Sequence, residues 1–334
     1  MGRTALIAVG GNALIRAGQS GTIAEQRENA ATTGRYIIEL IRSGYSVVVT
    51  HGNGPQVGAQ LLRSEIASGQ VNPEPLDVCG ADTQGSIGYV LEQALEYALD
   101  EAGLSTPVVT VITQTVVSEA DPAFQHPTKP VGPFYSAEEA QRRERELGWA
   151  MVEDSSRGYR RVVASPDPLE IVELKVIRSL VSDGYIVIAA GGGGIPVVRR
   201  GGHLIGVEAV IDKDLAAALL ASSLHVDLFI IATDEERVYV NYKRPGQAAL
   251  GRIGVAAVEA YVRAGQFPAG SMGPKIDAAL RFLRGGGQEV IITSPKHLLD
   301  AVLGAAGTHI VADARRHEET VAPLYEWLLD VYAL

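Results

Sequence analysis

The chain has 334 residues, enough for one large domain or two smaller ones with a sizeable hydrophobic core. Its net charge of -10 argues against nucleic acid or an anionic membrane as the main partner. No apolar run approaches the roughly 18 residues of a membrane span, and the apolar run close to the N-terminus leaves no room for a signal peptide. The single cysteine, Cys79, cannot form an internal disulfide. We therefore expect a soluble, cytoplasmic protein.

Short apolar runs alternate with longer amphipathic segments, a pattern typical of α/β proteins with a largely parallel sheet. In the first third of the chain, the predicted strands are Thr4–Val9, Ser46–Thr50 and Val108–Thr113, and the predicted helices are Ala24–Ser43 and Thr83–Ala102. In the second half, the predicted helices are Ile171–Ser182, Leu215–Ser222 and Pro274–Arg284, and the predicted strands are Tyr185–Ala190, Leu228–Ala232 and Glu289–Thr293. A last helix is predicted at Ala322–Leu334, where an apolar stripe would dock on the body or on a partner subunit.

The segment between about Val116 and Pro168 differs from the rest, because prolines, charges and short turns dominate it. Its Glu138–Leu147 stretch is charged and predicts an exposed helix. We interpret the segment as a small subdomain that projects from the first sheet. The chain is thus predicted to be a single domain, 1–334, with one half at 1–190 that includes the subdomain, a second half at 191–310, and a helical C-terminal extension at 311–334.

Three glycine-rich loops follow predicted strands: Gly10-Gly11-Asn12, Gly52-Asn53-Gly54 and Gly191–Gly194. At a strand-to-helix junction, glycine lets the backbone approach a ligand closely, and free N–H groups at the helix start favour an anion. The alternative is that Gly and Asn only make tight turns, and it stays open for each loop taken alone. His51, beside the second loop, is assigned a structural role.

Motifs for several other chemistries are missing from the sequence. No G-x-x-x-x-G-K-[ST] or G-x-G-x-x-G motif is present, which excludes a P-loop enzyme and disfavours a dehydrogenase. No His/Cys cluster has zinc-ligand spacing, and no G-x-S-x-G nucleophile elbow occurs.

Only six of the 29 basic residues are lysine, and three of these lie in loop motifs: Lys129, Lys213 and Lys275. Lysine is a compact, mobile point charge, which suits a reacting phosphoryl group. Lys213, in Asp212-Lys213-Asp214, precedes a predicted helix, where the alternative is an Asp N-cap beside a solvated lysine. Lys275 also stands at a helix start, which is electrostatically unfavourable unless an anion binds there. These lysines and the glycine-rich loops together point to phosphoryl transfer.

An acidic loop, Thr233–Tyr239, follows the predicted strand Leu228–Ala232 and would approach magnesium or a nucleotide. Three consecutive acidic residues are also typical of a solvated loop. Tyr242 and Met272 are candidates for apolar contact with an adenine, although core packing explains both equally well. The residues alone leave these choices open.

Taken in order, five blocks of the sequence resemble the carbamate kinases, a branch of the amino acid kinase family. The blocks are His51–Gly58, Pro127–Tyr135, Gly158–Val163, Gly206–Asp214 and Gly270–Lys275. The resemblance runs from the first strand to about Ile310, and implies a three-layer αβα sandwich around a mainly parallel sheet, with a small protruding subdomain, in a homodimer. Two features depart from it: Glu236-Arg237 stands where many relatives in the wider family carry Asp-Gly, and the segment beyond about Ala312 is longer than expected.

The resemblance implies reversible phosphoryl transfer between carbamoyl phosphate with ADP and carbamate with ATP, and we expect the ATP-forming direction. The carbamoyl phosphate would come from the breakdown of arginine, of purines or of allantoin-type compounds. Magnesium would be held through the nucleotide phosphates, so no metal ligands are expected in the protein. Residues 1–190 would form the carbamate half and residues 191–310 the nucleotide half. The alternatives are a related amino acid kinase that acts on another small carboxylate or a phosphonate, and a nucleotide-binding homologue without catalytic activity.

The resemblance also implies roles for the residues that match the family's motifs. Carbamate or carbamoyl phosphate would be held by Gly10, Gly11, Asn12, Gly52, Asn53 and Gly54. Lys213 and Lys275 would neutralise the transferring phosphoryl group, Asp214 would orient them, and Lys129 would close over the substrate. The nucleotide would be bound by Gly191, Gly192, Thr233, Asp234, Tyr242 and Met272.

Overall fold

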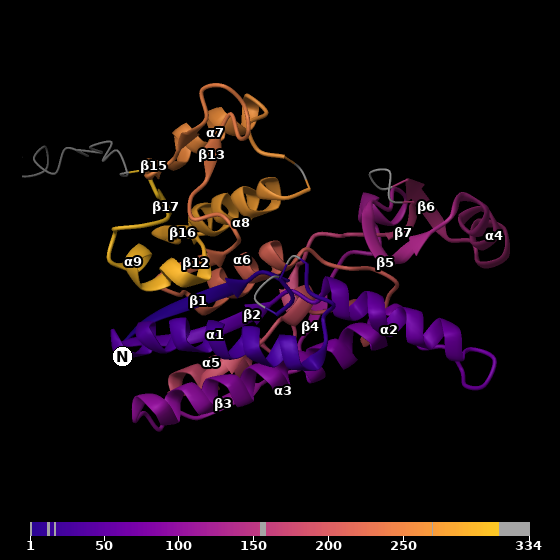
Figure 1. Ribbon diagram of the computed structural model, residues 1–334, viewed down its shortest axis with the longest axis horizontal. Helices are drawn as coiled ribbons and strands as arrows, with labels where there is room; N and C mark the ends of the chain where they lie inside the picture. Colours follow the sequence, from indigo (N-terminus) through magenta and orange to yellow (C-terminus); the bar gives the residue numbers. More distant parts are fainter. Residues whose placement is uncertain (1, 12–13, 17, 154–157, 269, 314–334) are drawn as a thin grey trace, which may run out of the picture.

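The computed structural model describes residues 2–11, 14–16, 18–153, 158–268 and 270–313. The predicted helix at Ala322–Leu334, and with it most of the predicted C-terminal extension, lies outside these residues. Within them, the chain forms one large sheet, three smaller sheets, and helices on both faces of the large sheet (Figure 1).

The large sheet has eight strands, and the strands that neighbour each other are parallel in every pair but one. In spatial order they are β15 (Arg252–Gly254), β17 (Thr308–Val311), β16 (Glu289–Thr293), β12 (Leu228–Ala232), β1 (Arg3–Val9), β2 (Tyr45–His51), β9 (Ile186–Ile188) and β3 (Val108–Thr110). The exception is β17, which is antiparallel to β16. Because the strands from β16 to β3 all run in the same direction, the loops that follow them gather at one edge of the sheet.

Both faces of the large sheet are buried, which explains why its central strands are continuously apolar. In β1, the residues from Ala5 to Val9 are 0% exposed. Since successive side chains point to opposite faces, Ile7 packs in one core and Leu6 in the other. The helices that cover the first face are α1 (Ile23–Arg42), α3 (Leu76–Ala102) and α9 (Leu298–Val302). The second face is covered by α5 (Leu174–Ser182), α6 (Lys213–Leu224), α7 (Val255–Arg263) and α8 (Met272–Arg284). The predicted three-layer αβα fold is confirmed.

Local sequence signals place several elements correctly. The strands β12 and β16 have their predicted bounds. α1 begins at Ile23, one residue before its predicted start, because Thr22 and Glu25 form a reciprocal cap. The Glu25 amide donates to Thr22 Oγ1 at 3.3 Å, and the Thr22 amide donates to Glu25 Oε2 at 2.8 Å.

Other predicted boundaries are wrong where tertiary contacts decide them. β3 ends at Thr110 instead of Thr113, because the Thr113 amide leaves the sheet and donates to Gln84 Oε1 at 2.8 Å. β9 ends at Ile188 because Ala190 takes a left-handed conformation with a φ of 52°. These contacts join residues that are far apart in the sequence, so the local pattern carries no sign of them.

Two predicted helix starts are also wrong, and one helix was not predicted. α5 begins at Leu174, because β8 (Glu170–Ile171) pairs with β4 (Gln114–Val116). α3 begins at Leu76, before its predicted start at Thr83. α2 (Gly54–Ala67), which follows the second glycine-rich loop, was not predicted, although Pro55 in its first turn is a favourable start signal.

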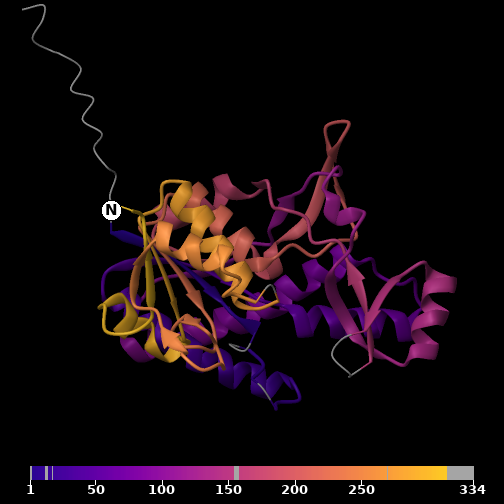
Figure 2. The same ribbon diagram turned by 90° about the horizontal axis from the view of Figure 1, so that it is seen from above.

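A smaller antiparallel sheet projects from one end of the molecule (Figures 1 and 2). This small sheet consists of β5 (Lys129–Tyr135), β7 (Tyr159–Val163) and β6 (Ala150–Glu153), with α4 (Ala137–Leu147) against β6 and β7. β5 also packs on α2, and Val131 and Val163 share a hydrophobic cluster with Val57 of that helix. The small sheet is therefore connected to the body through a core of its own.

The remaining described strands form two further sheets. They form a four-stranded sheet of β11 (His203–Gly206), β10 (Ile195–Arg200), β4 and β8, and a hairpin of β13 (Tyr239–Val240) and β14 (Ala248–Ala249). Short 3-10 turns occur at Pro122–Phe124, Gly191–Gly193 and Pro295–His297.

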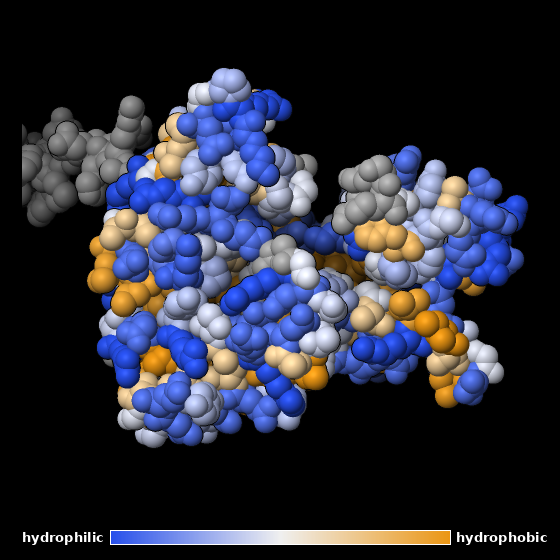
Figure 3. Space-filling model, in the orientation of Figure 1, coloured by the Kyte–Doolittle hydropathy of each residue, from blue (hydrophilic) through white to orange (hydrophobic). Residues whose placement is uncertain are grey.

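The face of the molecule in Figure 3 is mostly polar, with apolar groups near the end of α2. Ile66 in the last turn of this helix is 76% exposed, and Val71 just beyond it is 60% exposed. None of the described helices combines the length and the apolar character that crossing a membrane requires.

The contrast between Leu6 and Leu303 tests this description of the core. Leu6 in β1 is 0% exposed, whereas Leu303 is 71% exposed. We expect Leu6→Ala to lower the free energy of unfolding by about 2–5 kcal/mol, because it leaves a cavity between the sheet and its helices. The matched Leu303→Ala change should stay within about 0.5 kcal/mol of the wild type. Urea denaturation followed by circular dichroism measures both, and equal effects would contradict the assigned core.

Candidate active site

The loops singled out in the sequence gather where the chain order reverses in the large sheet. The chain continues from β1 to β2 on one side, whereas β12 and β16 lie on the other side of β1. Ligands of open α/β sheets bind beyond the carboxyl ends of the strands at such a position. Gly10 and Gly11 follow β1 here, and Thr233 follows β12.

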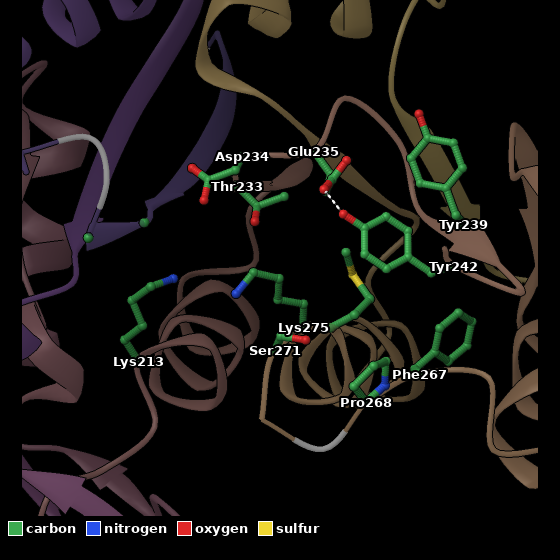
Figure 4. Close-up of a pocket in the computed structure, with 13 residues that line it drawn as sticks. Lys213, Thr233, Asp234, Glu235, Tyr239, Tyr242, Phe267, Pro268, Ser271 and Lys275 are labelled. Atoms are coloured by element: carbon green, nitrogen blue, oxygen red, sulfur yellow. Dashed lines mark hydrogen bonds between the residues drawn. The ribbon is translucent and has the colours of Figure 1, made fainter. Parts of the chain in front are cut away.

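Two lysines from different helices share one buried carboxylate at this position. Lys213 is the first residue of α6, and Lys275 lies in the first turn of α8. The Nζ of Lys213 lies 2.5 Å from Asp214 Oδ1, and the Nζ of Lys275 lies 3.0 Å from Asp214 Oδ2. Figure 4 shows both ammonium groups pointing into the same space. Two lysines that are 62 positions apart in the sequence therefore bring their ammonium groups to the same carboxylate.

The Asp214 carboxyl is only 3% exposed. Burial raises the pKa of Asp214, but the ammonium groups of Lys213 and Lys275 outweigh burial and lower the pKa to about 2. One buried negative charge therefore stands beside two positive charges. Because an uncompensated charge is costly away from water, this arrangement suits an anionic ligand.

Lys129, the first residue of β5 in the small sheet, reaches the same region from outside the large sheet. Its Nζ donates to Asp212 Oδ2 at 2.8 Å, and Asp212 Oδ1 accepts a hydrogen bond from the Asp214 amide at 2.9 Å. Asp212 is therefore the N-cap of α6, as one sequence alternative held. The neighbouring lysine is not solvated, however, because the side chain of Lys213 is only 15% exposed.

The first two glycine-rich loops lie against each other and against Lys213. A Cβ atom on Gly52 would lie 3.2 Å from the Gly11 nitrogen and 3.5 Å from Lys213 Cδ. Glycine permits this close approach of two backbones. Gly10 and Gly11 also line the cavity described below. Asn12, which the sequence assigns to the same loop, lies outside the described residues.

The start of α2 completes this side of the site. The helix begins at Gly54, with Asn53 as its N-cap residue. The Asn53 side chain makes no capping hydrogen bond, and its Nδ2 donates to Thr83 Oγ1 at 2.9 Å. The N–H groups in the first turn of α2 thus have no side-chain cap, and such groups favour an anion.

The third glycine-rich loop lies against His51 and Asn53. A Cβ atom on Gly191 would lie 2.3 Å from His51 Nε2, and one on Gly192 would lie 2.2 Å from Asn53 Nδ2. Gly192 also has a φ of +65°, which a residue with a side chain rarely adopts. The structure thus places Gly191 and Gly192, predicted as nucleotide contacts, beside His51 and beside Asn53, which is predicted to hold carbamate.

Buried threonines that the sequence did not single out hold this third loop in place. Thr50 Oγ1 donates to the Ala190 carbonyl at 2.9 Å, and the Ala190 amide donates to Thr113 Oγ1 at 2.9 Å. Thr115 Oγ1 donates to the Gly193 carbonyl at 3.0 Å. All three threonines are 0% exposed. Threonine is too common in and near strands to indicate such a role, so these three residues could be identified only from their contacts in the structure.

A cavity of about 390 Å³ opens beside the two lysines (Figure 4). It is lined by Gly10, Gly11, Lys213, Thr233, Asp234, Glu235, Tyr239, Tyr242, Phe267, Pro268, Ser271, Met272 and Lys275. Figure 4 shows Lys213 and Lys275 on one side, and Tyr242 and Phe267 on the other. The cavity therefore suits a ligand with an anionic end and a flat apolar end. Its lining includes four of the predicted nucleotide contacts: Thr233, Asp234, Tyr242 and Met272.

The aromatic wall of the cavity is held by a hydrogen bond that the sequence did not predict. The Tyr242 hydroxyl donates to Glu235, which raises the pKa of Tyr242. The ring of Tyr239 lies 6.0 Å from that of Tyr242, measured between centroids. Glu235 thus serves to orient the ring, and is not only part of a solvated loop.

Among the described residues, no group of three or more His, Cys, Asp or Glu side chains is arranged to hold a metal ion. Mg²⁺ at phosphoryl-transfer sites is usually bound through one or two carboxylates together with substrate phosphates. Asp234 lines the cavity with the two lysines (Figure 4). The site therefore fits a magnesium ion that is bound mainly to a nucleotide and contacted by Asp234.

His51 is buried beside the second and third loops, with 1% of its surface exposed. Burial is the main cause that lowers the pKa of His51 to about 4; the hydrogen bond with the Gly52 carbonyl raises the pKa in part, and the charge of Lys213 lowers it. That bond, at 3.1 Å, places the imidazole proton on Nδ1. His51 is thus a neutral side chain inside the site.

The chain is similar to known proteins along most of its length. The model of the amino acid kinase family matches residues 3–294. Carbamate kinase from Thermococcus kodakarensis is 49% identical over 313 residues, which cover 92% of this chain and 99% of that protein. The carbamate kinase-like protein YahI of Escherichia coli is 48% identical over 312 residues, which cover 92% and 98% of the two chains. The structure of carbamate kinase from Giardia lamblia bound to AMP-PNP matches with a TM-score of 0.89 and 44% identity, covering 93% of this chain and 99% of that one.

The buried neutral His51 makes stability depend on pH. The unfolded chain binds a proton at this histidine below the ordinary pKa of 6.5, whereas the folded protein does so only near 4. The free energy of unfolding should therefore fall as the pH drops from 6.5 to 4, with a share of up to about 3 kcal/mol from His51.

Replacing the histidine isolates this share. In His51→Gln the slope of unfolding free energy against pH should be shallower over that interval, in urea denaturation at a series of pH values. The exposed His203 provides the control, and His203→Gln should keep the wild-type slope. An unchanged slope in His51→Gln would show that His51 is not held neutral.

Proposed function

Because this chain belongs to the amino acid kinase family and is a phosphotransferase that acts on carbamate, we propose that it works in the ATP-forming direction. In that direction it transfers the phosphoryl group of carbamoyl phosphate to ADP. The observation that carries the assignment of the site is the pair of ammonium groups, from Lys213 and Lys275, on the one buried carboxylate of Asp214. An acyl phosphate has a higher phosphoryl-transfer potential than ATP, which favours this direction.

Lys213 and Lys275 neutralise the phosphoryl group during transfer in this proposal. The transferring group spreads its negative charge over its equatorial oxygens, and the protein contributes mainly alignment and charge neutralisation. Asp214 keeps both ammonium groups charged and in place. No general base is needed, because the terminal phosphate oxygen of ADP that attacks is already anionic, and carbamate leaves as an anion.

ADP occupies the cavity in this proposal, with its phosphates toward the lysines and its adenine toward Tyr242, Phe267 and Met272. Support comes from the separation of cationic and aromatic lining residues in Figure 4. Magnesium would be held by the nucleotide phosphates with Asp234, and when bound it supplies further neutralisation of phosphate charge.

Carbamoyl phosphate lies on the other side of the lysines in this proposal, between the first two glycine-rich loops and the start of α2. The contact of Gly52 with Gly11 and Lys213, and the uncapped first turn of α2, support this placement. Gly191 and Gly192 then belong to the carbamate side, where they pack on His51 and Asn53. Lys129 approaches from the small sheet.

We extend the proposal to the setting of the enzyme. Its likeness to carbamate kinases supports a cytoplasmic homodimer that acts in the breakdown of arginine or of a related nitrogen compound. A single buried cysteine, Cys79, is consistent with a reducing compartment.

Loss of one lysine tests the reaction and the site together. We expect Lys213→Ala to lower kcat for ATP formation from carbamoyl phosphate, ADP and Mg²⁺ by about 10²–10³, by analogy with the loss of one oxyanion donor. Lys175→Ala, at an exposed position of α5, is the matched control and should keep wild-type activity.

The possible outcomes of this assay separate the alternatives. Full activity in Lys213→Ala would refute the assignment of the site. A folded wild type that forms no ATP from carbamoyl phosphate would point to another small carboxylate or a phosphonate as the substrate.

The aromatic wall gives a second test, specific to the nucleotide. We expect Tyr242→Ala to raise KM for ADP about tenfold, since stacking of a base on an aromatic ring is worth about 1–3 kcal/mol. KM for carbamoyl phosphate should not change, because Tyr242 lies on the far side of the cavity from Lys213 (Figure 4). Steady-state kinetics with each substrate varied in turn measures both values. A rise in KM for carbamoyl phosphate alone would contradict the placement of ADP in this cavity and would favour carbamoyl phosphate there instead.

A further inference from the structure

Residues 206–212, which we call the connecting segment, lead from the end of β11 to the start of α6 and contact the small sheet. The Val210 amide donates to the Ala164 carbonyl, just beyond β7, at 2.9 Å. Glu208 forms an ion pair with Arg161 of β7. The position of the small sheet is therefore tied to the segment that leads directly into the helix of the phosphoryl-transfer site.

Asp212, the last residue of the connecting segment, uses its two carboxylate oxygens for two different elements. Oδ1 accepts from the Asp214 amide at 2.9 Å and caps α6. Oδ2 accepts from the ammonium of Lys129 in the small sheet at 2.8 Å. The Asp212 side chain is 15% exposed and that of Lys129 is 35% exposed, so the pair is partly shielded from water. One side chain therefore links the small sheet to the helix that carries Lys213.

We propose that Asp212 is a positioning residue that holds the Lys129 ammonium at the carbamoyl phosphate side of the site. This role depends on the proposed function, because it concerns the binding of that substrate. Lys213 and Lys275 already share the charge of Asp214, so a third ammonium brought near them is repelled. The Asp212 carboxylate supplies the negative charge that lets Lys129 stay there.

Simple helix capping is the competing explanation of Asp212. A cap requires only a side-chain acceptor at this position, whereas positioning requires a negative charge that reaches Lys129. The two roles also differ in what they affect. Lys129 is not among the residues that line the nucleotide cavity, so positioning acts on carbamoyl phosphate and leaves ADP binding unchanged.

The Asp212→Asn variant separates these roles, because Asn caps a helix about as well as Asp but carries no charge. We expect KM for carbamoyl phosphate to rise about tenfold, the effect of losing a hydrogen bond to a charged group. KM for ADP and the melting temperature should stay at their wild-type values. Asp212→Ser, which also provides a capping hydroxyl, should likewise raise KM for carbamoyl phosphate and leave KM for ADP unchanged. A wild-type KM for carbamoyl phosphate in both variants would refute the positioning role.

A double-mutant cycle shows whether Asp212 acts through Lys129. Lys129→Met removes the ammonium and keeps an unbranched side chain. If Asp212 acts through this lysine, adding Asp212→Asn to Lys129→Met produces no further rise in KM for carbamoyl phosphate. Fully additive effects of the two changes would overturn the proposal.

A chemical readout tests the contact without turnover. Acetic anhydride reacts with the lone pair of an unprotonated lysine nitrogen that is open to the reagent, and a carboxylate in contact with the ammonium opposes both conditions. Lys129 should therefore be acetylated faster in Asp212→Asn than in the wild type. Mass spectrometry measures this rate relative to that of the exposed Lys175. An unchanged ratio would show that Asp212 does not hold Lys129. If the wild type forms no ATP, the proposed function fails, and this ratio still decides whether the pair exists.

Discussion

The whole site depends on the burial of one carboxylate, Asp214, between two ammonium groups. A lone cation held away from water costs several kcal/mol, so α6 and α8 bring Lys213 and Lys275 to one buried point only because Asp214 is there. The carboxylate offsets one of the two positive charges. The charge that remains faces the cavity in which we place the nucleotide, and in our proposal it neutralises the phosphoryl group (Figure 4).

The surroundings of this cluster serve mainly to bring backbone close to it. Gly52 lies against Gly11 and Lys213, and the third loop packs on His51 and Asn53 at distances that exclude any side chain. A backbone this tight must have its polar groups satisfied internally, and buried threonines do this for the third loop. The glycines at the site therefore depend on the buried threonines, which satisfy the backbone groups of the tightly packed third loop.

The sequence predicts the layers of the fold well, because they follow from local patterns. Apolar runs mark β12 and β16 to the residue, and the predicted start of α1 is within one residue of the observed one. The site is harder to predict, since its residues meet only in the folded chain. The sequence marks Lys129 and Lys213 as unusual, but nothing local to either shows that Asp212 lies between them, 83 residues from Lys129. Ala190 is another case, because its left-handed backbone is stabilised by distant threonines.

The pairing of β1 with β12 determines how the two sides of the site are spaced. Val9 lies opposite Ala232 in a parallel ladder, so Gly10 and Thr233 begin their loops on adjacent strands, about 4.8 Å apart in sheets of this kind. A shift of one residue in this ladder would move one loop by about 3.3 Å along the other. Since these strands lie at the centre of the sheet, they separate only when the domain as a whole unfolds. Local fluctuations at the surface thus leave the alignment of the reactants intact, and heat should abolish activity and global structure at the same temperature.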